Sequence, residues 1–205
     1  MENYPANLNI NYSDKSDRLT VFFRIFLAIP ILIILGLLAS EVYKSRAGAE
    51  EYEHVYSVGI VFLPTLLMIL FRKKYPKWWF DWNLALTKFS VRVTSYVLLL
   101  RDEYPSTDEE QAVQIDIPYP DVEKELNRWM PLIKWFLVIP HVIILIFLFA
   151  IVILFTIFGW LIILLTGNYP KGMFDFVVGV MRWSLRVSAY AVLLTTDKYP
   201  PFSLS

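Results

Sequence analysis

Two sets of charged residues in this chain share one spacing, in which an acidic residue is followed seven and then four positions later by basic ones. The sets are Asp81, Lys88 and Arg92, and Asp175, Arg182 and Arg186. On a helix, positions with this spacing lie on one face. Such a face could bind anionic lipid headgroups or the charged face of a partner. The alternative is architectural, with ion pairs and long basic side chains that seat each helix at the headgroups.

A second candidate is His141, which follows Pro140 inside a long apolar run. An ionisable side chain within a membrane span is a functional hypothesis by default, here a proton relay or a ligand-binding group. No other histidine or carboxylate is close to it in the sequence. We therefore predict a structural or lipid-interface histidine and keep the intramembrane polar site as the alternative.

The composition excludes most other chemistry. The chain has no Cys and two His, which removes cysteine catalysis and most zinc sites. The sequence lacks a glycine-rich phosphate loop and the common hydrolase and metalloprotease motifs. A formal net charge of +0 argues against a nucleic-acid partner. We predict that the protein is not an enzyme and holds no metal or cofactor.

The same composition indicates an integral membrane protein. Hydrophobic residues make up 57% of the 205 residues and charged residues 19%, against about 45–50% and about 25% in soluble domains. Residues 1–20 are polar and lack the features of a cleavable signal peptide. We therefore expect the first apolar run to remain as a membrane anchor.

An internal repeat is the strongest feature of the sequence. Motifs recur in the same order, including Ile29-Pro30 with Ile139-Pro140, Tyr75-Pro76-Lys77 with Tyr169-Pro170-Lys171, and Asp102-Glu103-Tyr104-Pro105 with Asp197-Lys198-Tyr199-Pro200. We predict two tandem copies, residues 1–105 and 112–205, joined by an acidic linker. The first copy has an extra charged loop, residues 41–57, that the second lacks.

Each copy is expected to contain two membrane helices, an interfacial amphipathic helix and short strands, giving an α-helical membrane protein with a small cytoplasmic sheet. The predicted spans are 21–39, 57–71, 131–148 and 151–166. The predicted amphipathic helices are 78–94 and 172–188, each followed by a strand, 95–101 or 189–196. Alternating residues near Leu8 and Ile115 predict two more strands.

Two of these assignments have alternatives. Residues 135–166 contain no charged residue, and one straight helix there would be about 48 Å long at about 1.5 Å per residue. That exceeds a hydrocarbon core of about 30 Å, so we predict a hairpin with its turn near Ala150. The amphipathic helices could instead be true spans with buried charges, but two arginines at the centre of a span are costly.

Positive charge predicts the orientation in the membrane. Basic residues gather after the second predicted span, at Arg72, Lys73, Lys74 and Lys77, and before the third, at Lys124, Arg128 and Lys134. By the positive-inside rule, both termini and both amphipathic helices are cytoplasmic. We expect a multi-pass protein of the inner membrane.

The second copy resembles a bacterial multi-spanning membrane-protein family that is described only as a domain of unknown function. The resemblance rests on residues 168–187 and 189–202, on Ile117-Pro118-Tyr119-Pro120, on residues 127–135 and on Ile139-Pro140-His141. It covers copy two well and copy one loosely, with departures at Trp82-Asn83, Lys88 and the inserted loop. The resemblance implies a polytopic inner-membrane protein and supplies no catalytic residue.

The function predicted from these features is a non-catalytic scaffold or accessory subunit. Its cytoplasmic interfacial face would engage membrane lipids or a larger membrane complex, because the basic stripe occurs twice and the spans carry no charged centre. The alternative is a small transporter or channel with its pathway between the repeats. The sequence does not determine the oligomeric state.

Overall fold

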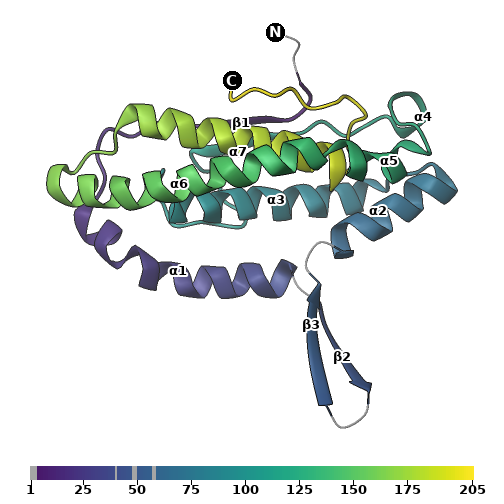
Figure 1. Ribbon diagram of the computed structural model, residues 1–205, viewed down its shortest axis with the longest axis horizontal. Helices are drawn as coiled ribbons and strands as arrows, with labels where there is room; N and C mark the ends of the chain where they lie inside the picture. The colour runs from purple at the N-terminus through teal and green to yellow at the C-terminus, as the bar shows by residue number, and fades with distance from the viewer. Residues whose placement is uncertain (1–3, 40, 48–49, 57–58) are drawn as a thin grey trace.

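Helices dominate the fold, and most of them run along the long axis of the molecule (Figure 1). The computed structural model describes residues 4–39, 41–47, 50–56 and 59–205. The strands are β1 (Asn7–Ile10), β2 (Glu41–Ala47), β3 (Glu50–Tyr56) and β4 (Val113–Asp116). The helices are α1 (Arg18–Ala39), α2 (Gly59–Arg72), α3 (Lys77–Val97), α4 (Val122–Glu125), α5 (Met130–Leu137), α6 (Ile139–Thr166) and α7 (Lys171–Ala191).

Helix α6 corrects the predicted hairpin of the second copy. It runs without a break through Ala150 and ends at Gly167, which takes a left-handed φ of 80°. Residues 131–148 and 151–166 are therefore not two spans but the short α5 followed by one long helix. Within α6, no pair of glycines occurs and no proline follows Pro140 in the first turn. Nothing in the sequence therefore breaks the backbone hydrogen bonds near Ala150. Its apolar side chains favour continuation.

The small sheet has two strands and not the four that were predicted. β1 pairs antiparallel with β4, and Leu8 lies opposite Ile115 at the centre of the ladder. Helix α3 continues to Val97 and α7 to Ala191, so the strands expected at 95–101 and 189–196 do not form. Both helices end in a turn in which a leucine takes positive φ, 65° at Leu99 and 56° at Leu194. This turn reverses the chain where an extended segment was expected.

The inserted charged segment of the first half is a β-hairpin and not an irregular loop. β2 and β3 pair antiparallel, with Lys44 opposite Glu53 and Arg46 opposite Glu51 in the register. Figure 1 shows the hairpin projecting away from the helices. The start of the second predicted span, residues 57–58, lies outside the described residues.

Helix α7 lies at the centre of the packing. It contacts β1, α5 and α6, while α1 packs on α3 and α6. Val177, Val180 and Tyr190 on α7 are fully buried. The amphipathic pattern therefore predicted the two helices α3 and α7 correctly. In α7, however, the apolar face is covered by protein.

Candidate functional site

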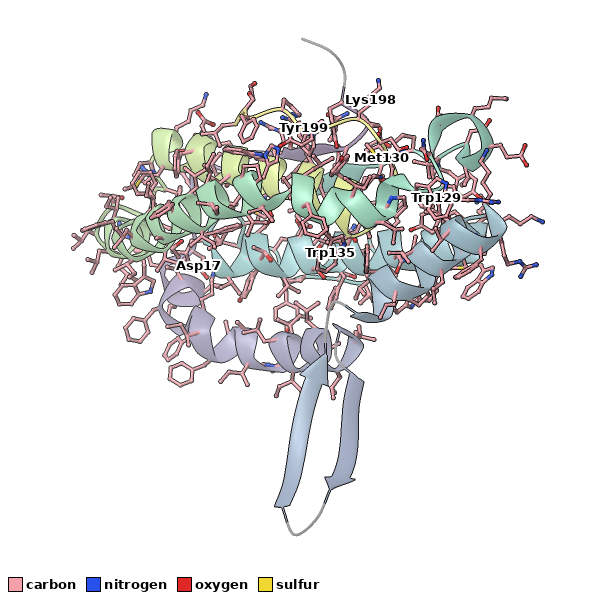
Figure 2. All side chains as sticks on the ribbon, turned by 45° about the vertical axis from the view of Figure 1, so that its right-hand side comes forward. Asp17, Trp129, Met130, Trp135, Lys198 and Tyr199 are labelled. Atoms are coloured by element: carbon pink, nitrogen blue, oxygen red, sulfur yellow. The ribbon has the colours of Figure 1, made fainter. Side chains whose placement is uncertain are left out.

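The apolar surface of α1 and α6 is the largest unusual feature of the exterior. In the part of the chain that the structure describes, these two helices are long and apolar enough to cross a membrane, and only 22% and 17% of the tested segments are buried. Helix α2 is shorter. Two helices of the described residues thus pass this test, and the predicted span 57–71, which includes residues outside the description, stays a prediction. Figure 2 shows side chains standing out from α1 on the side away from the other helices.

Large side chains make up this surface. On α1 they include Phe22, Phe23, Ile25, Phe26, Ile29 and Ile33, and on α6 they include Ile146, Phe147, Ile153, Leu154, Phe158 and Leu165. Soluble monomers rarely expose contiguous apolar patches above a few hundred Å². Exposed apolar side chains of this size favour an apolar environment over water.

The basic residues predicted on α7 face inward and hold other segments. Arg182 donates from Nε to the Leu8 carbonyl (3.1 Å) and from Nη1 to the Leu204 carbonyl (3.2 Å). Arg186 is only 7% exposed and donates to the Ser205 carbonyl (2.6 Å). Burial, followed by the neighbouring charge of Arg182, lowers the pKa of Arg186. These cations attach β1 and the C-terminal segment to α7.

The corresponding residues of α3 are not gathered into one site. Arg92 is half-buried and donates to the Ser106 carbonyl (2.8 Å). Asp81 is exposed and pairs with Lys77 (3.3 Å). Lys88 is half-buried, and Asp175 on α7 is exposed. The predicted spacing placed these residues on helices correctly, but Asp81 pairs with Lys77 and Arg92 with the Ser106 carbonyl.

A buried ion pair that the sequence analysis did not propose joins Arg24 to Asp102. Arg24 is 2% exposed, and its Nη1 donates to the carbonyls of Tyr96 and Arg101, both at 3.0 Å. The guanidinium carbon lies 4.5 Å from the centre of the Tyr96 ring. Asp102 also accepts from the backbone N–H of Asp17 (2.8 Å). The two terminal nitrogens of the guanidinium are thus paired, while its buried Nε has no hydrogen-bond partner.

A second ion pair, between Lys134 and Asp197, has the same construction. Lys134 is fully buried, with its Nζ 2.8 Å from the Asp197 carboxylate and 2.7 Å from the Thr196 carbonyl. Its ammonium lies 4.8 Å from the centre of the Tyr190 ring, and Asp197 accepts from the N–H of Asn127 (2.6 Å). The charge pattern placed Lys134 among the basic residues before the third predicted span. In the structure it is a buried partner of Asp197.

A signal for both pairs was present in the sequence. Arg24 and Lys134 stand at the same distance before the repeated Ile-Pro motif, and Asp102 and Asp197 begin the repeated segment that ends in Tyr-Pro. Matching the cation of one repeated motif to the carboxylate of the other would have found them.

His141 lies in an aromatic cluster. It is fully buried, and its Nδ1 accepts a hydrogen bond from the indole N–H of Trp183 (3.0 Å). The imidazole stacks on Phe202, with ring centroids 3.9 Å apart, and Tyr199 lies 4.9 Å away. Among the described residues, no group of three or more His, Cys, Asp or Glu side chains could hold a metal ion.

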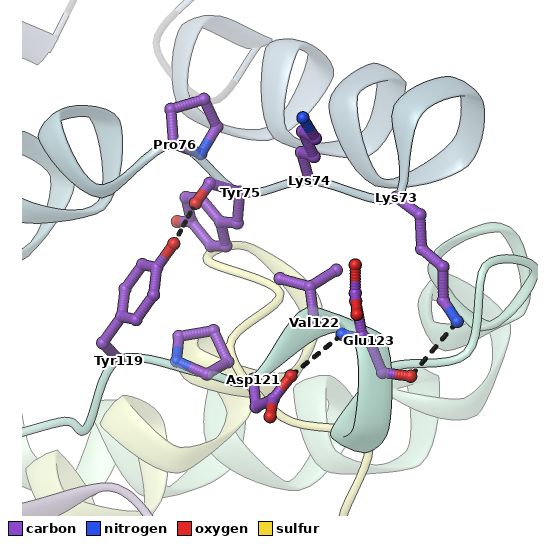
Figure 3. A pocket seen from close by; sticks show the side chains of 9 residues that line it. Lys73, Lys74, Tyr75, Pro76, Tyr119, Asp121, Val122 and Glu123 are labelled. Carbon is purple, nitrogen blue, oxygen red and sulfur yellow. Dashed lines mark hydrogen bonds between the residues drawn. The ribbon is translucent and has the colours of Figure 1, made fainter.

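An open groove lies between the turn that joins α2 to α3 and the segment that contains α4. It has a volume of about 520 Å³ and is lined by residues 73–76 and 119–123. At one end, the Tyr119 hydroxyl donates to the Tyr75 carbonyl, and across it the Lys73 ammonium donates to the Glu123 carbonyl (3.1 Å), as Figure 3 shows. A neighbouring hollow of about 600 Å³ shares Lys73 and adds Lys124 and Arg128.

Comparison with known proteins gives one family. Residues 128–203 match the family model described as a domain of unknown function (DUF4389). No curated protein and no solved structure matches the chain. The predicted resemblance of the second half to a domain of unknown function is confirmed for these residues.

The DUF4389 stretch contains α5, α6 and α7, the Lys134–Asp197 pair and His141. The Arg24–Asp102 pair lies outside it. The groove beside α2 also lies outside it, because all nine lining residues precede residue 128. The open groove is thus a feature of the part of the chain that the family model does not cover.

Proposed function

We propose that the protein is a multi-pass inner-membrane protein without catalytic activity that serves as a scaffold or accessory subunit. Helices α1 and α6 lie in the hydrocarbon layer, and the polar side engages lipid headgroups or a membrane complex. The observation that carries the proposal is the exposure of large apolar side chains on α1 and α6, such as Ile25 at 74% and Phe147 at 68%.

The energetics favour lipid around these helices. Removing one large aliphatic or aromatic side chain from water stabilises a protein by about 1.5–3 kcal/mol. A helix that is hydrophobic all round is either the core of a large protein or a membrane helix. Because little of α1 or α6 is buried within the chain, the hydrocarbon layer is the environment that suits them.

Both termini are proposed to lie on the cytoplasmic side. Arg182 holds the two ends of the chain close together, because it donates to the Leu8 carbonyl and to the Leu204 carbonyl. Figure 1 shows β1 and the C-terminal segment on the side opposite the β2–β3 hairpin. The basic residues near the groove favour the cytoplasmic assignment by the positive-inside rule.

We also propose that residues 1–105 and 112–205 are tandem copies of one unit. The two buried ion pairs support this, since each has the same kinds of partner. Contacts between the halves are also reciprocal: Tyr12 donates to the Tyr169 carbonyl (2.6 Å), and Tyr119 donates to the Tyr75 carbonyl. The β1–β4 register is likewise centred on a pair of equivalent positions, Leu8 and Ile115.

Membrane residence is tested by extraction and by labelling. The protein is expected to stay with membranes in alkaline carbonate and to require detergent for release. Since the chain has no Cys, an Ala150→Cys variant carries a single thiol at the middle of α6. A membrane-impermeant maleimide should label it only after detergent is added, and should label an Asp108→Cys control in the exposed linker when applied from the cytoplasmic side. Release by carbonate would overturn the proposal.

A further inference from the structure

The groove between α2 and α4 has two walls of opposite charge. The Lys73 side chain reaches into the groove from one wall, while Lys74 of the same wall points away from the gap (Figure 3), and the carboxylates of Asp121 and Glu123 belong to the other wall. Asp121 accepts from the Glu123 N–H (3.2 Å) and pairs with Lys124 (3.1 Å). The hydrogen bond from Lys124 is the largest cause of a lowered pKa at Asp121, so this group is a carboxylate at neutral pH.

The walls are held in place by a backbone turn and by two side-chain hydrogen bonds to backbone carbonyls. Lys73 ends α2 with φ of 50° and turns the chain into the buried Tyr75. The Tyr119 hydroxyl ties the opposite wall to the Tyr75 carbonyl (Figure 3). The Lys73 ammonium reaches the Glu123 carbonyl across the gap. The groove is therefore largely preformed, as ligand sites usually are.

The corresponding corner of the second half is filled by the chain itself. Gly167 and Asn168 precede Tyr169-Pro170 as Lys73 and Lys74 precede Tyr75-Pro76. The Gly167 carbonyl accepts from the Ser16 N–H (2.9 Å), and the Asn168 amide is placed to donate to the Asp14 carbonyl (2.6 Å). One corner is thus closed by neutral backbone contacts, while its counterpart is open and carries charges of both signs.

Exposed indoles lie next to the groove in sequence on both walls. Trp78, in the first turn of α3, is 69% exposed, and Trp129, just before α5, is 62% exposed. Tryptophan prefers the headgroup level of a bilayer. In a membrane-embedded protein, these residues place the groove among phospholipid headgroups.

We infer that this groove binds the headgroup of a phospholipid of the phosphoethanolamine class. The phosphate meets the Lys73 ammonium, and the primary ammonium donates hydrogen bonds to Asp121 and Glu123. A phosphoglycerol headgroup would leave the carboxylate wall unmatched, and a phosphocholine ammonium has no N–H to donate. The inference rests on the proposed membrane location.

Native mass spectrometry of the full chain in detergent tests the site. The probes are phosphatidylethanolamine, phosphatidylcholine and phosphatidylglycerol with identical acyl chains. We expect the ethanolamine lipid to be retained roughly tenfold more than the other two, the range of about one charge-assisted hydrogen bond. Glu123→Gln should remove the preference over phosphatidylcholine, and Lys73→Gln should reduce binding of both zwitterionic lipids. Lys171→Gln, at the position equivalent to Lys77 in the second half, is the matched control and should change neither.

The outcomes separate the two proposals. Equal retention of the ethanolamine and choline lipids, or preference for phosphatidylglycerol, would overturn the groove inference while leaving carbonate resistance intact. Displacement of the lipid by soluble phosphoethanolamine at equal concentration would show a site for a free phosphate ester and overturn the lipid assignment. Extraction of the protein by carbonate would overturn the membrane proposal itself. Thermal unfolding of each variant checks that its fold is retained.

Discussion

Arg24 and Lys134 are buried cations whose partners leave little of their charge unmatched. Each has a carboxylate, at least one backbone carbonyl and the face of a tyrosine ring around it. Desolvating an ion costs several kcal/mol, so such groups persist only where all partners are present. Each pair attaches the turn after one helix to an earlier helix of the same half. Asp102, after α3, binds Arg24 on α1, and Asp197, after α7, binds Lys134 on α5.

We predict that Asp102→Asn and Asp197→Asn each lower the free energy of unfolding by about 3 kcal/mol, because each leaves a buried cation without its carboxylate. The measurement is thermal or denaturant unfolding in detergent. Asp175→Asn is the control, since Asp175 is exposed and should give no comparable change. Equal stability of all three variants would show that the pairs contribute nothing.

His141 organises the C-terminal segment. We predict that His141→Ala destabilises the protein by about 3 kcal/mol, since it opens a cavity between Trp183 and Phe202. Trp183→Phe keeps the aromatic packing but removes the donor to Nδ1, with an expected cost of about 1–2 kcal/mol. Limited proteolysis should cut the variants earlier near residue 199. A His141→Ala protein with unchanged stability but altered solute flux in liposomes would instead favour the transporter alternative.

At the level of elements, helices were predictable and their connections were not. The apolar run of α1 and the amphipathic pattern of α3 and α7 are local signals, and all three form. The strand predicted at 189–196 failed because its apolar residues fit a helix end plus a left-handed turn at Leu194 as well as a strand. The continuity of α6 through Ala150 agrees with the absence of a turn residue there, and the hairpin was predicted from the length of the apolar run.

The candidate site was predictable in part for the same reason. Spacing placed Arg182 and Arg186 on one helix face, but it could not show that β1 and the C-terminal segment occupy that face. The groove brings Lys73 and Glu123 together from opposite sides of α3 in the sequence. Only the pairing of the two halves creates it.

The N-terminus of α1 provides a pH-dependent contact. Asp17 accepts from the Leu19 N–H (3.2 Å) and the Thr20 hydroxyl (2.6 Å), and the Thr20 bond is the main cause of its lowered pKa. Stabilisation by the carboxylate is therefore present above its ordinary pKa of 3.8 and is lost as the pH falls through the lower pKa of the folded state.

We predict that Asp17→Asn keeps the cap but removes this dependence, since asparagine caps helices about as well as aspartate. The Asn127 amide oxygen makes the same kind of contact, accepting from the N–H two residues on, that of Trp129 (2.9 Å). The difference in melting temperature between wild type and variant should narrow between pH 5 and pH 3. A constant difference across that range would contradict the assignment.

At the scale of the whole molecule, neither half completes its own packing. Each supplies one strand of the two-stranded sheet, and each receives a tyrosine hydroxyl from the other. The two halves therefore complete each other's packing through the sheet and these hydrogen bonds.

This interdependence predicts that the covalent linker is dispensable once the protein has folded. A protease site inserted within residues 107–110, which are exposed, should be cleaved in detergent while the halves continue to elute together in size-exclusion chromatography. Tyr12→Phe and Tyr119→Phe remove the two reciprocal hydrogen bonds, each at a cost of about 1 kcal/mol, and the double variant should separate at a lower denaturant concentration after cleavage. Tyr104→Phe is the control, because that tyrosine contacts Tyr96 of its own half. If the halves separate on cleavage alone, the sheet and the tyrosine contacts are too weak to join them, and the linker holds the two halves together.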